Sequence, residues 1–117
     1  MGVDLTIMPQ SYRFDECIVT QHAIQFERDR TLFEAIEKSG QEVDAGMPVT
    51  CHFALTADGE TCYGEVTENP YGTPITSMTA GQMHDVLSPH QMHGSNVWIF
   101  AALGAMHRDL HVYLYWH

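Results

Sequence analysis

Basic residues are scarce in this sequence, and its middle has none. The 117 residues include five Lys and Arg against fifteen Asp and Glu, which gives a formal net charge of −10 at pH 7. No Lys or Arg occurs from Ser39 to His107. Direct binding of nucleic acid needs basic side chains that neutralise phosphates, so this composition argues against it. An acidic surface instead favours encounter with a basic partner, most strongly at low salt.

Long apolar runs and a secretory signal are also missing. The longest uncharged apolar run, 97–106, is too short to span a bilayer. No basic region precedes an apolar one at the start, so neither secretion nor membrane association is expected. The three cysteines are an odd number, and free thiols in a reducing cytoplasm are their simplest interpretation. The expected location is therefore cytoplasmic.

Catalytic signatures do not occur either. The sequence has no glycine-rich phosphate loop, no Gly-x-Ser-x-Gly, no His-Glu-x-x-His and no Cys-x-x-Cys. We therefore expect no cofactor and assign no catalytic or metal-binding residue. Eight histidines are nevertheless many for this length, and they leave open a small metal-dependent or histidine-based enzyme. The residues it would use are His84, His90 and His93, with His107 and His111.

The segment 49–66 has the alternation of a β-hairpin closed by Asp58-Gly59. Glycine tolerates the positive φ that a two-residue turn needs. This turn places His52 opposite Glu65 on the outer face of the hairpin. The two residues then form either a general-base pair or, more commonly for such neighbours, a cross-strand pair that stabilises the sheet.

Strands are also predicted at both ends of the sequence. The first alternates up to Pro9, and the last, 111–116, is apolar on both faces, which is typical of a central strand. Strands and helices do not alternate regularly along the chain. We therefore predict a single α+β domain over 1–117, with a mixed or antiparallel sheet of about five strands, a central hairpin at 49–66 and about three helices.

Start signals mark the helices. Thr31 with Glu34, and Thr79 with Gln82, have the spacing of capping boxes. The third helix is predicted over 96–106 with Ser95 as its N-cap. This segment is apolar all round, so the helix is predicted to be buried on most sides.

Carboxylates and tyrosines gather in and after the hairpin. Tyrosine offers a large contact area at a low entropy cost, and aromatic residues among carboxylates suit a basic protein surface. The alternative is that the tyrosines pack at the edge of the sheet. An unpaired hairpin edge would also allow a homodimer by strand addition. The predicted partner-binding face consists of Asp58, Glu60, Tyr63, Glu65, Glu68 and Tyr71.

Several short stretches resemble a group of small uncharacterised proteins from bacteriophage and prophage genomes. They are the opening MGVDLT, the middle YG…TENPYG, the ending LYWH, and the charged step at 26–33. The stretch 78–93 departs from that group. Because the group has no assigned activity, the resemblance implies only a context, the cytoplasm of a bacterial host cell.

With the acidic face, the resemblance predicts a non-enzymatic inhibitor or modulator of a host factor, for example an anti-CRISPR or other anti-defence protein. Its partner would be a bacterial protein or nucleoprotein complex with a basic surface.

Overall fold

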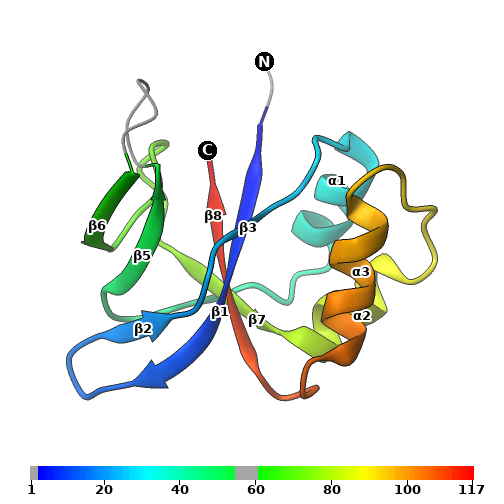
Figure 1. Cartoon of the computed structure of the whole chain (residues 1–117). Coiled ribbons are helices and arrows are strands. Elements are labelled where there is room, and N and C mark those ends of the chain that lie inside the picture. Colours follow the sequence, from blue (N-terminus) through cyan, green and yellow to red (C-terminus); the bar gives the residue numbers. More distant parts are fainter. Residues whose placement is uncertain (1–2, 55–60) are drawn as a thin grey trace.

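A mixed sheet with helices on one face forms the framework of the molecule (Figure 1). The computed structural model describes residues 3–54 and 61–117, with the backbone alone for 51–54 and 61–63. In chain order the elements are β1 (Leu5–Arg13), β2 (Ile18–Thr20), β3 (Ile24–Gln25), α1 (Arg30–Lys38), β4 (Val43–Asp44), β5 (Val49–Ala54), β6 (Thr61–Val66), β7 (Thr76–Thr79), α2 (Ala80–Leu87), α3 (Asn96–Ala105) and β8 (His111–Trp116).

The strands lie in the order β4-β7-β8-β1-β2-β5-β6, with β3 beside β1. The β2–β5 pair is parallel and the other pairs are antiparallel. The predicted α+β class is therefore confirmed. The sheet has eight strands where about five were predicted. Four of the eight (β2, β3, β4 and β7) have only two to four residues, too few for a clear periodic signal. The β5–β6 hairpin lies at one end of this order and not at its centre.

Two apolar clusters lie on opposite faces of the central strands. The first joins β1, β7 and β8 to the three helices. The second lies between the other face of β1 and β8 and the half of the sheet formed by β2 and β5. The molecule thus has three layers, which Figure 1 shows from right to left as helices, central strands and hairpin side.

The central position predicted for the last strand is confirmed. β8 pairs with β1 on one side and β7 on the other. Val112 and Leu114 face the helices, and Tyr113 and Tyr115 face the second cluster. All four side chains are buried, because each face of the strand is covered.

The first strand does not end at Pro9 but runs on to Arg13. Proline lacks a backbone N–H and is tolerated in a strand near a bulge. The pairing of β1 with β2 shifts register between Gln10 and Tyr12, directly after the proline. The Pro9 carbonyl still accepts a hydrogen bond from the Gln21 N–H at 2.7 Å.

The hairpin pairs in a register shifted by two residues from the predicted one. Thr50 lies opposite Glu65, and His52 lies opposite Tyr63, so the predicted His52–Glu65 pair is wrong. A shift of two keeps every side chain on its predicted face, so alternation alone cannot separate the two registers. The predicted Asp58-Gly59 turn falls outside the described residues.

The first two helices differ in how well their starts were predicted. At α2 the capping box of Thr79 and Gln82 is present in both directions. At α1 the N-cap is Asp29, whose side chain accepts from the Leu32 N–H, and the predicted capping role of Thr31 is wrong. Asp29 also caps well and comes two residues earlier, so the longer helix forms.

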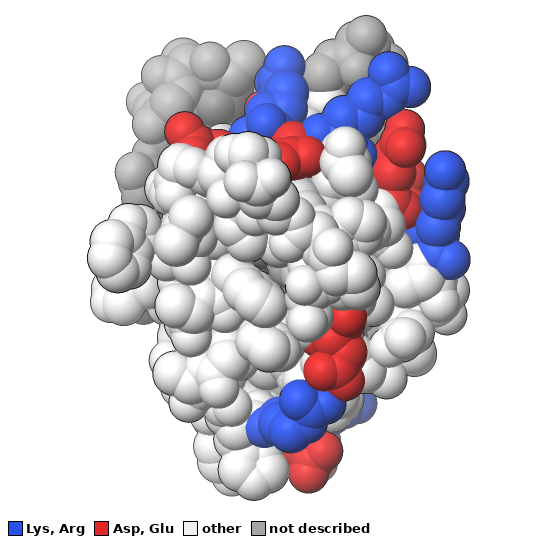
Figure 2. Space-filling view, turned by 90° about the vertical axis from the view of Figure 1, so that its right-hand side faces the viewer, with Lys and Arg blue, Asp and Glu red and all other residues white. Residues whose placement is uncertain are grey.

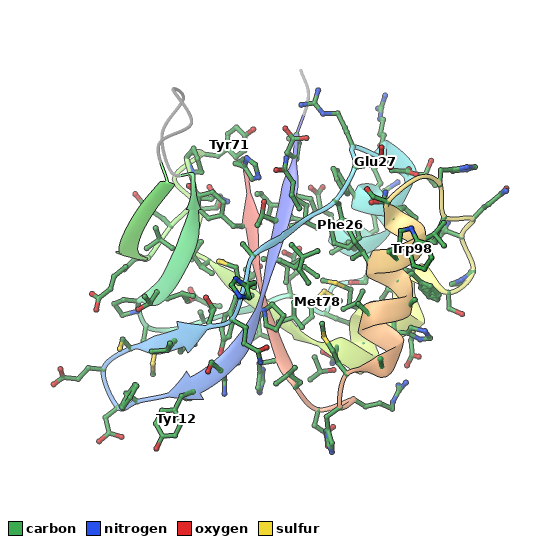
Figure 3. The ribbon with its side chains drawn as sticks, in the orientation of Figure 1. Tyr12, Phe26, Glu27, Tyr71, Met78 and Trp98 are labelled. Carbon is green, nitrogen blue, oxygen red and sulfur yellow. The ribbon has the colours of Figure 1, made fainter. Side chains whose placement is uncertain are left out.

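The third helix is not buried on most sides, contrary to the prediction. Only Asn96, Ile99 and Leu103 are fully buried, and Trp98 is 77% exposed. The helix packs mainly on α2, with its buried side toward the core. No element within residues 3–54 and 61–117 covers its outer side (Figure 3).

A clasp between Glu27 and the start of α3 holds this helix in place. The buried Asn96 side chain accepts from the Glu27 N–H at 2.8 Å and donates to the Glu27 carbonyl at 3.0 Å. The Glu27 carboxylate accepts from the Ser95 N–H at 2.7 Å. Gly94 has a φ of +56°, and a Cβ there would collide with that carboxylate.

The half-buried ring of His117 is expected to make the stability depend on pH. Its Nε2 lies 2.8 Å from the Thr6 hydroxyl, and burial lowers the pKa of the ring, with Asp4 opposing. Below the ordinary histidine pKa of 6.5 the unfolded chain takes up this proton before the folded one. The unfolded state then binds more protons, so stability falls as the pH drops through this range.

We expect His117→Gln to reduce the dependence of the free energy of unfolding on pH in this range. Urea unfolding at several pH values from neutral to mildly acidic would measure it. An unchanged slope in the variant would show that other groups cause the dependence.

Candidate functional site

A tightly bonded turn follows β6 and carries part of the predicted binding face. The Asn69 Oδ1 accepts from the N–H groups of Tyr71 and Thr73, at 2.9 and 3.2 Å. The Asn69 N–H donates to the Thr73 carbonyl, and Gly72, with a φ of +80°, closes the turn. These bonds fix the backbone while the Tyr71 side chain stays 48% exposed (Figure 3).

A hollow of about 390 Å³ lies between this turn and the loop after β4. We call it the acidic groove, and its lining residues are Asp44, Gly46, Met47, Pro48, Thr67 and Pro74. Glu68 forms a β-bridge with Pro74 and so lies at the rim. Its volume is in the range of binding pockets. The groove therefore has carboxylates on the two segments that flank it.

Four of the five basic side chains form ion pairs away from the groove. Arg28 donates to Asp4 at 2.9 and 3.1 Å and holds the pKa of that carboxyl below its usual value. The other ion pairs join Arg30 and Lys38 to Glu34, and Arg108 to Asp85.

Among the described residues, no Lys or Arg pairs with Asp44, Glu65 or Glu68. Their negative charge therefore remains available to a basic partner.

The structure describes the side chains of three of the six residues in the predicted partner-binding face. Glu65, on β6, and Glu68 and Tyr71, on the turn, are exposed and come from one continuous segment. Asp58 and Glu60 lie outside the described residues, as does the side chain of Tyr63. Asp44 was missing from the prediction. It joins the groove because β4 pairs with β7, and the sequence signal was only an acidic loop in the stretch without Lys or Arg.

A second hollow, of about 280 Å³, lies beside β4 and β7, and its lining residues include Arg13 and His111. Tyr113 forms part of its wall and donates to the Gln10 side chain at 2.6 Å. Burial raises the pKa of this phenol, which Arg13 opposes. Tyr113 is therefore a hydrogen-bond donor at neutral pH and not a base.

The histidine clusters of the alternative hypothesis are not brought together. His84 stacks on Phe100, with ring centroids 4.3 Å apart, between α2 and α3. The Nδ1 of His107 accepts from the Asp109 N–H, and His93 and His111 are exposed. Within the described part of the chain, no three His, Cys, Asp or Glu side chains are grouped as metal ligands.

Comparison with known proteins gives no relative. No protein-family model, no curated protein and no solved structure matches the chain. In the portion that the structure describes, none of the helices has the length and apolar character needed to cross a bilayer.

Proposed function

We propose that this protein is a non-enzymatic inhibitor or modulator of a bacterial host factor, such as an anti-CRISPR or other anti-defence protein. A basic surface of the partner docks at the acidic groove and on the neighbouring residues Glu65, Glu68 and Tyr71. The observation that carries this proposal is the groove itself, whose flanking carboxylates have no cation among the described residues. The resemblance to phage proteins supports the bacterial context.

The chemistry of the groove suits a lysine or arginine side chain. Asp44 lies in its wall and Glu68 at its rim, so a cation entering the groove meets carboxylates from both flanking segments. Tyr71 adds an exposed aromatic ring on a backbone that the Asn69 bonds already hold, which lowers the entropy cost of binding. The excess of negative charge speeds the encounter at low salt.

Charge reversal at Glu65 and Glu68 tests this proposal. The Glu65→Lys/Glu68→Lys variant changes two exposed side chains. We expect it to weaken partner binding about tenfold or more at low salt, because like charges then meet across the interface. Capture from bacterial lysate by immobilised protein identifies the partner, and titration at several salt concentrations measures its affinity.

The matched control is Asp15→Lys/Glu16→Lys, which makes the same charge change in the β1–β2 turn. It should keep most of the affinity, since only the general field of the molecule has changed. Equal affinity of the Glu65→Lys/Glu68→Lys variant and the wild type, at low and moderate salt, would refute docking of the partner on these carboxylates beside the acidic groove.

A further inference from the structure

The hollow of about 280 Å³ beside β4 and β7 is lined by a basic side chain that has no acidic partner. We call it the Arg13 hollow. Figure 2 shows the helical side of the molecule, where blue basic side chains lie beside red acidic ones. Within residues 3–54 and 61–117, Arg13 takes part in none of the ion pairs. Its guanidinium is therefore available to an anion from solution.

A shift of register in β1 turns Arg13 toward this hollow. Gln10 lies opposite Thr20 before the shift, and Arg13 lies opposite Ile18 after it. The two partners on β2 are two residues apart and share a face of the sheet, so Gln10 and Arg13 share that face too. In a regular strand, residues three apart point to opposite faces, so the irregularity re-aims Arg13. Gln10 accepts from the Tyr113 hydroxyl on the same face.

The registers of β4, β7 and β8 place the other walls of the hollow on this face. Tyr113 lies opposite Ser77, and Ser77 lies opposite Val43. His111 lies opposite Thr79, two residues further along the same strands. Residues directly opposite each other share a face, and Tyr113 belongs to the second apolar cluster. All five side chains therefore lie on the side of the sheet that Arg13 faces.

Ser77 adds a buried hydroxyl to the wall of the hollow. Its side chain is only 8% exposed, and its hydroxyl forms no hydrogen bond within the described part of the chain. A buried polar group without a partner costs free energy, so such groups are uncommon. An acceptor atom placed in the hollow would supply the missing partner.

We propose that the Arg13 hollow binds a short aliphatic carboxylate. The carboxylate lies between Arg13 and Ser77, with His111 at the rim, and the hydrocarbon part lies on Val43 and Ala45. The planar guanidinium matches the two oxygens of a carboxylate. The volume has room for about nine water-sized groups, so the ligand is small.

The charge of the molecule favours a carboxylate over a phosphate. The chain carries −10, so its field opposes each negative charge that a ligand brings. A carboxylate brings one such charge, whereas a phosphate group brings about 1.5 to 2 at neutral pH. Val43 is 64% exposed beside the hollow and offers apolar contact to a hydrocarbon chain but not to inorganic phosphate.

The Arg13 hollow and the acidic groove both include Asp44 in their walls. Asp44 lies opposite Thr76, which lies opposite Leu114, and Leu114 faces the helices. The Asp44 side chain is therefore on the other face of the sheet, away from Arg13. Binding of a carboxylate in the Arg13 hollow is thus independent of partner docking at the acidic groove.

Nuclear magnetic resonance titration of the ¹⁵N-labelled protein with sodium butyrate tests the proposal. Sodium chloride keeps the ionic strength constant up to about 50 mM butyrate. We expect saturable shifts of the amide signals of residues 43–45, 77–79 and 111–113, with a dissociation constant in the millimolar range because the probe is small. Acetate should bind severalfold more weakly, since it buries less hydrocarbon. Butyramide, the neutral analogue, should give no saturable shift.

Arg13→Gln removes the charge that the proposal requires and should weaken butyrate binding at least about tenfold. The matched control is Arg30→Gln, which makes the same charge change on α1, where Arg30 pairs with Glu34. It should keep the affinity of the wild type. Ser77→Ala removes one hydroxyl and should weaken binding severalfold. The amide spectra also check that each variant folds.

Saturable shifts around the hollow that Arg13→Gln removes and Arg30→Gln retains would support the proposal. The absence of saturation by butyrate would overturn it, as would equal binding of butyramide. Equal weakening in Arg13→Gln and Arg30→Gln would also overturn it, because the effect would then come from the general field of the molecule. Tighter binding of inorganic phosphate than of butyrate would refute the carboxylate as the ligand.

Discussion

Asn96→Ala is expected to destabilise the fold by about 3 kcal/mol, because it removes two hydrogen bonds and leaves two backbone groups of Glu27 without their partner. Asn96 is 1% exposed, so water does not replace its side chain readily. For a domain of this size the loss corresponds to a fall of about 10 °C in Tm. Urea unfolding followed by circular dichroism measures it.

Ser95→Ala is the matched control at the neighbouring position. The Ser95 side chain makes no capping hydrogen bond within the described part of the chain, and the Glu27 carboxylate binds the Ser95 N–H instead. We therefore expect a change below about 0.5 kcal/mol, although serine at an N-cap normally contributes more. A large loss in Ser95→Ala, or none in Asn96→Ala, would contradict the clasp.

Leu114→Ala should cost about 3 kcal/mol, through the lost apolar contacts and the cavity left behind. Leu114 is completely buried in β8, between Ile7 of β1 and Thr76 of β7, and faces the helices. Neighbours in paired strands are held by hydrogen bonds and cannot collapse easily into the space. The measurement is again the free energy of unfolding in urea.

Val43→Ala is the control for a strand residue outside the core. Val43 lies in β4, at the other end of the sheet from the hairpin, and is 64% exposed. Its truncation should change the free energy of unfolding by less than about 0.5 kcal/mol. Similar losses of free energy of unfolding in Leu114→Ala and Val43→Ala would contradict the central position of β8 in the sheet.

Local patterns predicted the parts of the fold that depend on local interactions. The two apolar faces of 111–116 indicated a central strand, and Thr79 with Gln82 indicated a helix start, because both signals lie within a few residues. The exposed side of α3 could not be predicted in this way. An all-apolar segment indicates how much apolar surface needs covering, but not which element covers it.

The candidate site likewise has parts that local sequence patterns predicted and parts that depend on contacts between distant residues. The exposure of Glu65, Glu68 and Tyr71 followed from alternation and turn chemistry. The position of Asp44 beside them depends on pairing between β4 and β7, which are separated by some thirty residues and related by no local pattern. The clasp of Asn96 on Glu27 spans 69 residues and had no sequence signal at all.

The pairing of β1 with β8 has a consequence for how the protein folds. The backbone groups of Asp4 and His117 exchange hydrogen bonds at 2.9 Å, and Thr6 contacts a side chain 111 residues further along. During synthesis, the inner strand β1 has to wait for β8 to leave the ribosome before it gains that neighbour. Such distant pairing slows folding and prolongs the exposure of apolar strands. In a cell, this chain is therefore expected to need chaperones most in the interval before β8 has left the ribosome.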